Sequence, residues 1–293
     1  MSESADIKSL IYLLDDEDRE IFRMVREKLI GMGMAAVPDL ESAWEESFNP
    51  LLQQRIEDIV QKIQFSDVAR ALGAWRSSES GNLLDGWVIL SRYQFPDLDQ
   101  KRIFSQLYQI RQDAWIEIND DLTALEKVRV LNHIIYSMHG YGANSTNYHA
   151  PGNYFLNNLA ESKRGNAVSL SALYLVICRW LNIPVYGVNL PGHFILAYKD
   201  EGSMSLLSNG RENERVLFYL NPLNQGAVFS RREIDVYLKR MRLEPQISHY
   251  APCGDDEVLA VMLGNLAKAY RNEDRIEKAI ELEELLGILR GTF

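Results

Sequence analysis

Three segments of the chain follow one another in the order of a Cys-His-Asp hydrolase core. Asn166-Ala167 opens an apolar helix pattern, His193 stands at the start of a strand pattern, and Asn221 ends a later strand pattern. In such a core a thiolate at the helix start attacks the substrate, an imidazole carries the proton, and a third polar group orients the imidazole. Ala167 stands where the thiol belongs, and a methyl group is no nucleophile. The pattern therefore predicts the geometry of an active site but not its reaction.

The remaining polar residues favour a cleft at this helix start. Asn166 is a good N-cap, because its side chain accepts a hydrogen bond from a backbone N–H of the first turn. Unpaired N–H groups and the helix dipole lower the pKa of a thiol at the same place. Asn221 is able to fix the tautomer of His193, but a neutral amide does not stabilise an imidazolium by charge. The candidate cleft-lining residues are Asn166, Ser169, Ser171, His193 and Asn221, and the vestigial triad positions are Ala167, His193 and Asn221.

Four blocks of sequence around these residues resemble one known family. They are RGNAVSLS at the helix start, NLPGHF at the histidine, YLNPLNQG at the asparagine, and the final helix pair. The region from Leu122 to Leu289 is similar to bacterial transglutaminase-like proteins that carry a C-terminal tetratricopeptide unit. The resemblance implies a papain-like fold whose catalytic Cys, His and Asp positions correspond to Ala167, His193 and Asn221. Because two of these positions differ, we expect a catalytically inactive protein that binds a protein or peptide partner or acts as a scaffold.

A second hypothesis keeps an enzymatic activity by using a different nucleophile. Ser169 and Ser171 lie in the first turns of the same helix, and Ser171 shares the face of Ala167 one pitch deeper. A serine needs a strong base, and the competing interpretation is that both hydroxyls bond to backbone groups. Cys253 lies in a Pro/Gly loop before an acidic helix start, where the helix dipole lowers a thiol pKa and the carboxylates raise it. An active hydrolase or acyltransferase would combine one of these residues with His193.

The charge and the cysteine content exclude several other function classes. A formal charge of −10 over 293 residues argues against nucleic acid and against an anionic membrane surface as partners. Cys178 and Cys253 are too few for a disulfide framework, and the five histidines show no metal-site spacing. We therefore expect no cofactor and no metal. The polar start of the chain, without a signal-peptide pattern, and the absence of a long apolar run favour a cytoplasmic protein.

The first third of the chain has helical periodicity. Helices are expected after Asp15–Asp18 up to Gly31–Gly33, from Pro38 to Trp44, and from Asn49-Pro50 along a stripe from Leu52 to Ile63, with Ser66-Asp67 starting another. Short helices paired around the turn at residues 31–38 resemble HEAT-like repeats. A third hypothesis follows, in which the chain is a helical-repeat adaptor. Its helices between residues 15 and 63 would capture the partner, and its core would be purely structural.

The middle of the chain changes from helices to a mixed pattern. Three more helices are expected at residues 83–93, 99–118 and 120–138, followed by a loop-rich stretch. The segment from Ala167 to Leu181 is apolar nearly all round, which predicts a buried helix. Short apolar runs then predict strands at residues 185–188, 194–198, 204–207 and 216–220, with a turn at Asn209-Gly210. Together these elements predict a small antiparallel sheet packed on one central helix.

The C-terminal part returns to helix. A capping-box pattern at Ser230–Glu233 begins one helix, and two antiparallel helices at residues 256–270 and 275–289 form one tetratricopeptide-like unit. The whole sequence therefore predicts an α+β protein in three parts. They are an all-helical, HEAT-like region at residues 1–78, a transglutaminase-like core with its preceding helices at 79–250, and a tetratricopeptide-like helical hairpin at 251–293.

Overall fold

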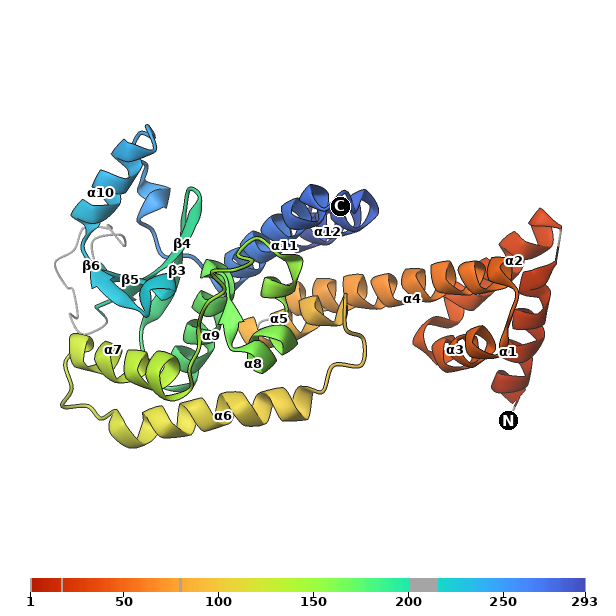
Figure 1. Ribbon diagram of the computed structural model, residues 1–293, viewed down its shortest axis with the longest axis horizontal. Coiled ribbons are helices and arrows are strands. Elements are labelled where there is room, and N and C mark those ends of the chain that lie inside the picture. Colours follow the sequence, from red (N-terminus) through yellow and green to blue (C-terminus); the bar gives the residue numbers. More distant parts are fainter. Residues whose placement is uncertain (1, 17, 79–80, 201–215, 293) are drawn as a thin grey trace.

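One long helix, α4 (Pro50–Ser77), joins a small helical bundle at the N-terminus to a larger mixed core (Figure 1). The computed structural model describes residues 2–16, 18–78, 81–200 and 216–292. Asn49 caps α4, since its Oδ1 accepts from the backbone N–H of Leu51 at 3.0 Å, and Pro50 suits the first turn because it has no N–H to leave unpaired. Two apolar cores share this helix. The first half of α4 buries Ile56, Ile59 and Ile63 in the bundle, and the second half buries Phe65, Val68 and Leu72 in the larger core.

In the N-terminal bundle two helices, α2 (Arg19–Met32) and α3 (Val37–Glu46), pack on the first half of α4, and a further helix, α1 (Ser2–Tyr12), packs on those two. The sequence predicted α2 and α3, and Asp18 caps α2 by accepting from the N–H of Glu20 at 2.8 Å. It did not predict α1, whose apolar signal is short and centres on the buried Ile7 and Ile11. The resemblance of this bundle to HEAT-like repeats stays a prediction.

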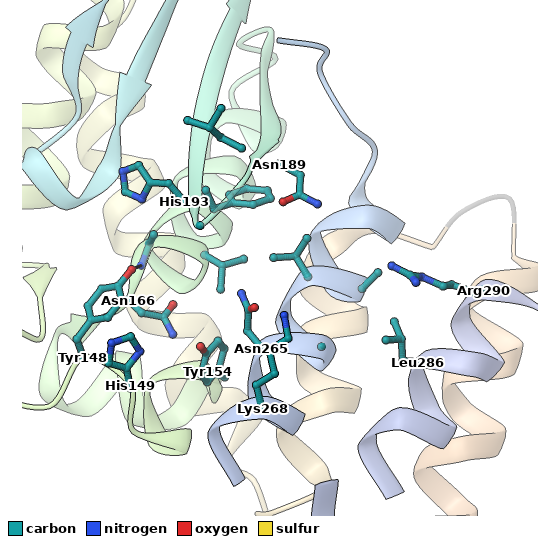
Figure 2. Close-up of a pocket in the computed structure, with 18 residues that line it drawn as sticks. Tyr148, His149, Tyr154, Asn166, Asn189, His193, Asn265, Lys268, Leu286 and Arg290 are labelled. Carbon is teal, nitrogen blue, oxygen red and sulfur yellow. Dashed lines mark hydrogen bonds between the residues drawn. The ribbon is translucent and has the colours of Figure 1, made fainter. Parts of the chain in front are cut away.

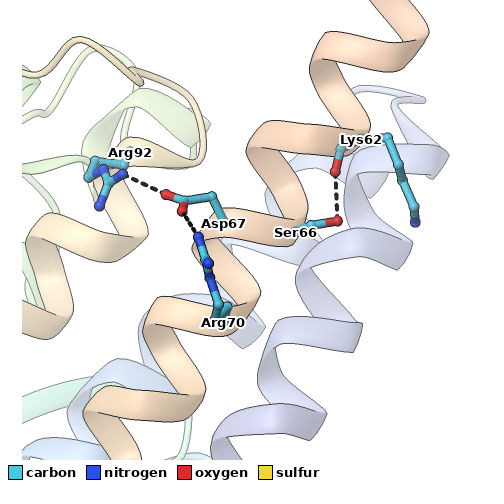
Figure 3. A network of polar contacts seen from close by, with 5 residues as sticks. All are labelled: Lys62, Ser66, Asp67, Arg70 and Arg92. Carbon is cyan, nitrogen blue, oxygen red and sulfur yellow. Dashed lines mark hydrogen bonds and ion pairs between the residues drawn. The ribbon is translucent and has the colours of Figure 1, made fainter. Parts of the chain in front are cut away.

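The helix start predicted at Ser66-Asp67 is wrong, because α4 runs through these residues without interruption. Ser66 Oγ donates to the carbonyl oxygen of Lys62 at 2.8 Å, so its hydroxyl is satisfied one turn earlier in the same helix (Figure 3). The carboxylate of Asp67 accepts from Arg70 at 2.5 Å and from Arg92 of the next helix at 2.6 Å. Asp67 therefore ties α4 to its neighbour and does not cap a new helix.

After α4 the chain continues with the helices α5 (Leu83–Arg92), α6 (Gln100–Glu117) and α7 (Ala124–Asn132). The predicted start of the third at Asp120 is too early, because Thr123 and Glu126 form a capping box. Glu126 Oε2 accepts from the N–H of Thr123 at 2.8 Å, and Thr123 Oγ1 accepts from the N–H of Glu126 at 3.4 Å. A π-helical turn, His133–Met138, then continues α7.

The central helix is α9 (Ala167–Trp180), as its apolar pattern predicts. Every residue from Ala167 to Cys178 is buried, so protein surrounds this helix on all sides. Its neighbours include α5, α6 and two strands of the sheet. Among the described residues, no helix combines the length and apolarity needed to cross a membrane.

A four-stranded antiparallel sheet packs on α9, with its strands in the order β3-β4-β5-β6. The strands are β3 (Val185–Leu190), β4 (His193–Lys199), β5 (Val216–Asn221) and β6 (Ala227–Phe229). The predicted α+β architecture is therefore confirmed, and β6 is a strand that the sequence did not predict. The strand predicted at residues 204–207 and the turn at Asn209-Gly210 lie outside the described residues. After β6 comes α10 (Arg231–Arg240), which starts with the predicted Ser230–Glu233 capping box.

The stretch before α9, expected as loop, contains regular structure. Two short strands, β1 (Gly142–Ala143) and β2 (Arg164–Gly165), pair in parallel, and α8 (Leu156–Ser162) lies between them in the sequence. The guanidinium of Arg164 also donates to the carbonyl oxygen of Gly140 at 2.6 Å. These contacts hold the chain in place just before α9 begins.

The C-terminal hairpin packs directly against the larger core. Its helices, α11 (Asp255–Asn272) and α12 (Ile276–Arg290), are antiparallel, and Gly291 ends α12 with a left-handed φ of 69°. The first helix contacts α5 and α9, and the second lies along α4 (Figure 1). The tetratricopeptide-like assignment and the part boundaries at residues 78 and 250 stay predictions.

Because Ile59 is fully buried in the N-terminal bundle, we expect Ile59→Ala to lower the free energy of unfolding of that bundle by about 2–5 kcal/mol. The matched control is Asp58→Ala, which changes an exposed neighbour on α4 and should stay within about 0.5 kcal/mol of the parent. Urea denaturation followed by circular dichroism measures both variants. Equal stability of the two variants would contradict the place of Ile59 in this core.

Candidate functional site

A cavity of about 490 Å³ lies at the N-terminal end of α9 (Figure 2). Its volume falls within the range of ligand pockets in general. Four parts of the chain supply its wall: the loop before α8, the start of α9, the turn between β3 and β4, and the C-terminal hairpin. Its residues include Tyr148, His149, Tyr154, Asn166, Ala167, Asn189, His193, Asn265, Lys268 and Arg290. Ala167 and His193, which the sequence placed on two different elements, therefore line one cavity.

A reciprocal capping box fixes the start of α9. Asn166 Oδ1 accepts from the N–H of Ser169 at 3.0 Å, and Ser169 Oγ accepts from the N–H of Asn166 at 3.0 Å. Gly165 precedes the box at a point where a Cβ atom would overlap Ser169 Oγ, so the close approach requires glycine. The N–H of Ala167 donates to Tyr148 Oη at 3.4 Å. The first turn of α9 is thus satisfied by protein groups while Ala167 forms part of the cavity wall.

The two serines of the displaced-nucleophile hypothesis lie behind this wall. Ser169 and Ser171 are both fully buried, and neither is among the residues that line the cavity. Ser169 Oγ takes part in the capping box, and Ser171 Oγ donates to the carbonyl oxygen of Ala167 at 2.7 Å. Both hydroxyls therefore bond to backbone groups, which is the competing interpretation drawn from the sequence.

The third alternative nucleophile, Cys253, lines a different hollow beside Pro191 and His249. Its N–H donates to the carbonyl oxygen of Gly187 at 2.8 Å. Burial, followed by the carboxylates around Glu257, raises the pKa of Cys253 to about 12. Burial and the carboxylates therefore outweigh any lowering of this pKa by the helix dipole, and very little of Cys253 is thiolate at neutral pH.

His193 stands at the first position of β4 and bonds to Asn221 at the end of β5. The strand register, which pairs Leu196 with Leu220, places the two residues diagonally on one face of the sheet. Asn221 Oδ1 accepts from the N–H of Leu223 at 3.1 Å, which holds the amide in place beside the imidazole. Burial lowers the pKa of His193, and the hydrogen bond to Asn221 raises it by less. The imidazole is therefore neutral at pH 7.

Hydrogen bonds among asparagines hold one part of the cavity wall in place, and the sequence did not predict this network. Asn144 Nδ2 donates to Asn153 Oδ1 at 2.9 Å, and Asn153 Nδ2 donates to the carbonyl oxygen of Tyr148 at 2.9 Å. This network positions Tyr148 and His149 at the cavity. The sequence predicted only a loop-rich stretch at this point, and its run of asparagines was the available signal.

The hairpin supplies the other unpredicted part of the wall. Asn265 and Lys268 lie three residues apart on α11, so they share one face of that helix, and Arg290 ends α12. Figure 2 shows them across the cavity from His193. The sequence predicted the hairpin but gave no sign that this face meets the start of α9.

Residues 101–264 match a family model described as the transglutaminase-like superfamily. The chain belongs to this superfamily. The match spans the region from α6 into α11 and includes the three positions Ala167, His193 and Asn221. The family resemblance drawn from the sequence is therefore confirmed. That Ala167 occupies the position of the catalytic cysteine stays a prediction from the resemblance.

Related bacterial proteins align with a large part of the chain. A UPF0162 protein of Xylella fastidiosa is 27% identical over 216 residues, which cover 67% of this chain and 68% of the relative. Protein SirB1 of Salmonella typhimurium is 25% identical over 209 residues, which cover 70% of this chain and 72% of the relative. A UPF0162 protein of Pasteurella multocida is 31% identical over 110 residues, which cover 38% of this chain and 42% of the relative. No solved structure gave a significant match.

Since Asn221 accepts a hydrogen bond from His193, a carboxylate at this position should hold a protonated imidazole more strongly. We expect Asn221→Asp to raise the pKa of His193 and Asn221→Leu to lower it further, as measured by NMR titration of the imidazole. In the parent the pKa is depressed, so the stability contributed by neutral His193 is complete above about pH 6.5 and declines as the pH falls below it. An unchanged His193 titration in Asn221→Asp would argue against the contact.

The electrostatic effect of the start of α9 on a thiol can be tested directly by introducing a cysteine there. The positive end of the helix dipole stabilises a thiolate at the first turn, so we expect the thiol of Ala167→Cys to titrate below the ordinary value of about 8.5. The pH dependence of alkylation by iodoacetamide measures this pKa. Ser171→Cys, one turn deeper in the same helix, is the matched control and should react slowly, because burial raises the pKa of a thiol there as it does for Cys178. An ordinary or raised pKa for Ala167→Cys would mean that the reactive position has been misassigned.

Proposed function

We propose that this chain is a catalytically inactive member of the transglutaminase-like superfamily that binds a peptide segment of a protein partner in the cavity at α9. The observation that carries the proposal is that Ala167 and His193 line one cavity. The imidazole is neutral and bonded to Asn221, as a general base should be. The residue across from it has no proton to give and no lone pair with which to attack. The site is therefore suited to holding a ligand and lacks the group that would react with it.

The positions of the alternative nucleophiles support the same proposal. Ser169 and Ser171 use their hydroxyls within α9, and Cys253 lies in another hollow with a raised pKa. For one of them to react with a ligand in the cavity, the start of α9 or the loop around residue 253 would have to rearrange. An active hydrolase or acyltransferase therefore has less support than a binding protein.

The polar groups of the wall suit a peptide. Asn166 Nδ2 is buried and has no hydrogen-bond partner among the described residues, and Asn166 is one of the residues that line the cavity. A buried amide without an acceptor is unusual in a folded protein, and a carbonyl oxygen of a ligand is the group that it lacks. Asn189 and Asn265 add further amides, and Leu190 and Phe194 add apolar surface. A peptide offers carbonyl oxygens, amide hydrogens and side chains to match such a wall.

One observation favours the helical-repeat adaptor as a second candidate function. Phe48 and Tyr12 on the N-terminal bundle are 98% and 85% exposed. Large aromatic side chains at a protein surface supply contact area to a partner. The two candidates differ in where the partner binds, at the bundle or at the start of α9.

The experiment combines a test for turnover with a test for binding. The parent protein is incubated with the peptide Ac-Ala-Gln-Ala-NH₂ and an amine donor, and we expect no transamidation and no deamidation by mass spectrometry. The same peptide alone should shift the NMR signals of the Asn166 side-chain amide and the His193 ring. Ala167→Leu, which adds bulk to the cavity wall, should weaken this binding by about tenfold or more.

Cys253→Ser is the matched control, because this residue lies outside the cavity and its replacement should leave the affinity unchanged. Thermal unfolding of both variants checks that they are folded. Turnover that disappears in His193→Ala would overturn the proposal of an inactive protein. Equal binding by the parent and Ala167→Leu would remove the cavity as the binding site.

A further inference from the structure

The charge of the cavity wall is opposite to that of the whole chain. The chain carries a formal charge of −10, yet the wall contains Lys268 and Arg290 and includes no aspartate or glutamate. The carboxylate of Glu257 accepts from Asn189 at 3.0 Å but lines the neighbouring hollow. A cationic wall in an anionic protein attracts anionic ligands to this place in particular.

The two cations come from different helices and stand at one end of the cavity. Lys268 rises from α11 beside Asn265, and Arg290 reaches toward it from the end of α12, while Asn166 and His193 lie on the opposite side (Figure 2). The cavity therefore has a cationic end at the hairpin and a neutral amide-and-imidazole end at α9. A ligand that fills it would need different chemistry at its two ends.

Neither cation has a partner in the part of the chain that the structure describes. No hydrogen bond, ion pair or aromatic ring engages the ammonium of Lys268 or the guanidinium of Arg290 among those residues. Other basic side chains of the hairpin are paired, since Arg271 bonds to Glu283 at 2.6 Å and Lys278 donates to Gln94 at 2.6 Å. The cations at the cavity are thus available to a ligand where others of the same hairpin are already engaged.

We propose that the cavity recognises a peptide carboxylate, which Lys268 and Arg290 bind at the hairpin end while the peptide's amide groups lie toward Asn166 and His193. This inference rests on the proposed function, because it names the chemistry of the peptide that the site takes. An arginine and a lysine together bind a carboxylate through charge-assisted hydrogen bonds. The carboxylate belongs to an acidic side chain or to the end of a chain. A nucleic acid is disfavoured, because its many phosphates would be repelled by the remaining surface.

The test uses three series of peptides in which one, two or three alanines separate a glutamine from the final residue. The first series is Ac-Gln-(Ala)-Glu-NH₂ and its longer forms, which carry a side-chain carboxylate. The second ends in Gln with a free C-terminal carboxylate, and the third ends in Gln-NH₂ and is neutral. Isothermal calorimetry and NMR measure the affinity of the parent protein for each. We expect at least one carboxylate series to bind about tenfold more tightly than the neutral series of the same length.

The variant Lys268→Gln/Arg290→Gln should abolish this preference, so that carboxylate and neutral peptides of the same length bind with equal affinity. The matched control is Lys239→Gln/Arg240→Gln, which removes the same charge from exposed positions on α10 and should keep the preference. Thermal unfolding confirms that both variants are folded. Inorganic phosphate is included as a competitor.

The outcomes separate this inference from the proposed function. Equal binding of the acidic and neutral series would overturn the carboxylate assignment and leave peptide binding in place. Absence of binding by all three series would overturn both. Displacement of the acidic peptides by phosphate at equal concentration would show that the cations take any small anion, and a preference that survives in Lys268→Gln/Arg290→Gln would place the carboxylate elsewhere. Loss of the preference in that variant alone would support the assignment.

Discussion

The burial of α9 on all sides is the constraint on which the rest of this structure depends. A helix leaves the N–H groups of its first turn without partners inside the helix, and a buried helix has little water to satisfy them. Asn166 and Ser169 meet this need by capping each other, and Tyr148 accepts from the N–H of Ala167. The loop before α9, the paired strands β1 and β2, and the asparagine network around Asn153 all bring those partners into place. The cavity lies where this enclosure is incomplete.

The same constraint explains why the wall of the cavity is composite. An apolar helix of this kind needs more cover than the sheet gives, and α5, α6 and α11 all contact it. In covering α9, the hairpin brings Asn265, Lys268 and Arg290 to the helix start. The transglutaminase-like core and the hairpin therefore contribute opposite ends of one site, and neither part contains the whole site. The transglutaminase-like core supplies the end of the cavity at His193. The positive charge at the opposite end comes from Lys268 and Arg290, which the packing of the C-terminal hairpin brings there.

Local signals predicted the elements well wherever the physical cause was local. The apolar run from Ala167 identified α9, the Ser230–Glu233 box identified the start of α10, and short apolar runs identified β3, β4 and β5. The failures also have local causes. A serine followed by an aspartate resembles an N-cap at Ser66, but its hydroxyl bonds back to Lys62 inside α4. Asp120 and Asp121 also resemble an N-cap, but α7 begins after the capping box at Thr123, a few residues later. Short elements such as α8 and β6 give too few periods to stand out from loop, and in α1 the buried apolar residues are few, Ile7 and Ile11.

The sequence by itself determined the superfamily, the order of the main elements and the residues at three positions of the site, because periodicity, caps and motif spacing are properties of neighbouring residues. It also determined that Ala167 brings no nucleophile to the helix start. Only the tertiary structure decided that His193 shares a cavity with Ala167, that Ser169 and Ser171 stay behind its wall, and that Lys268 and Arg290 charge its far end. The composition of the cavity depends on which helix faces pack together. That packing is determined by the shapes of side chains that are far apart in the sequence.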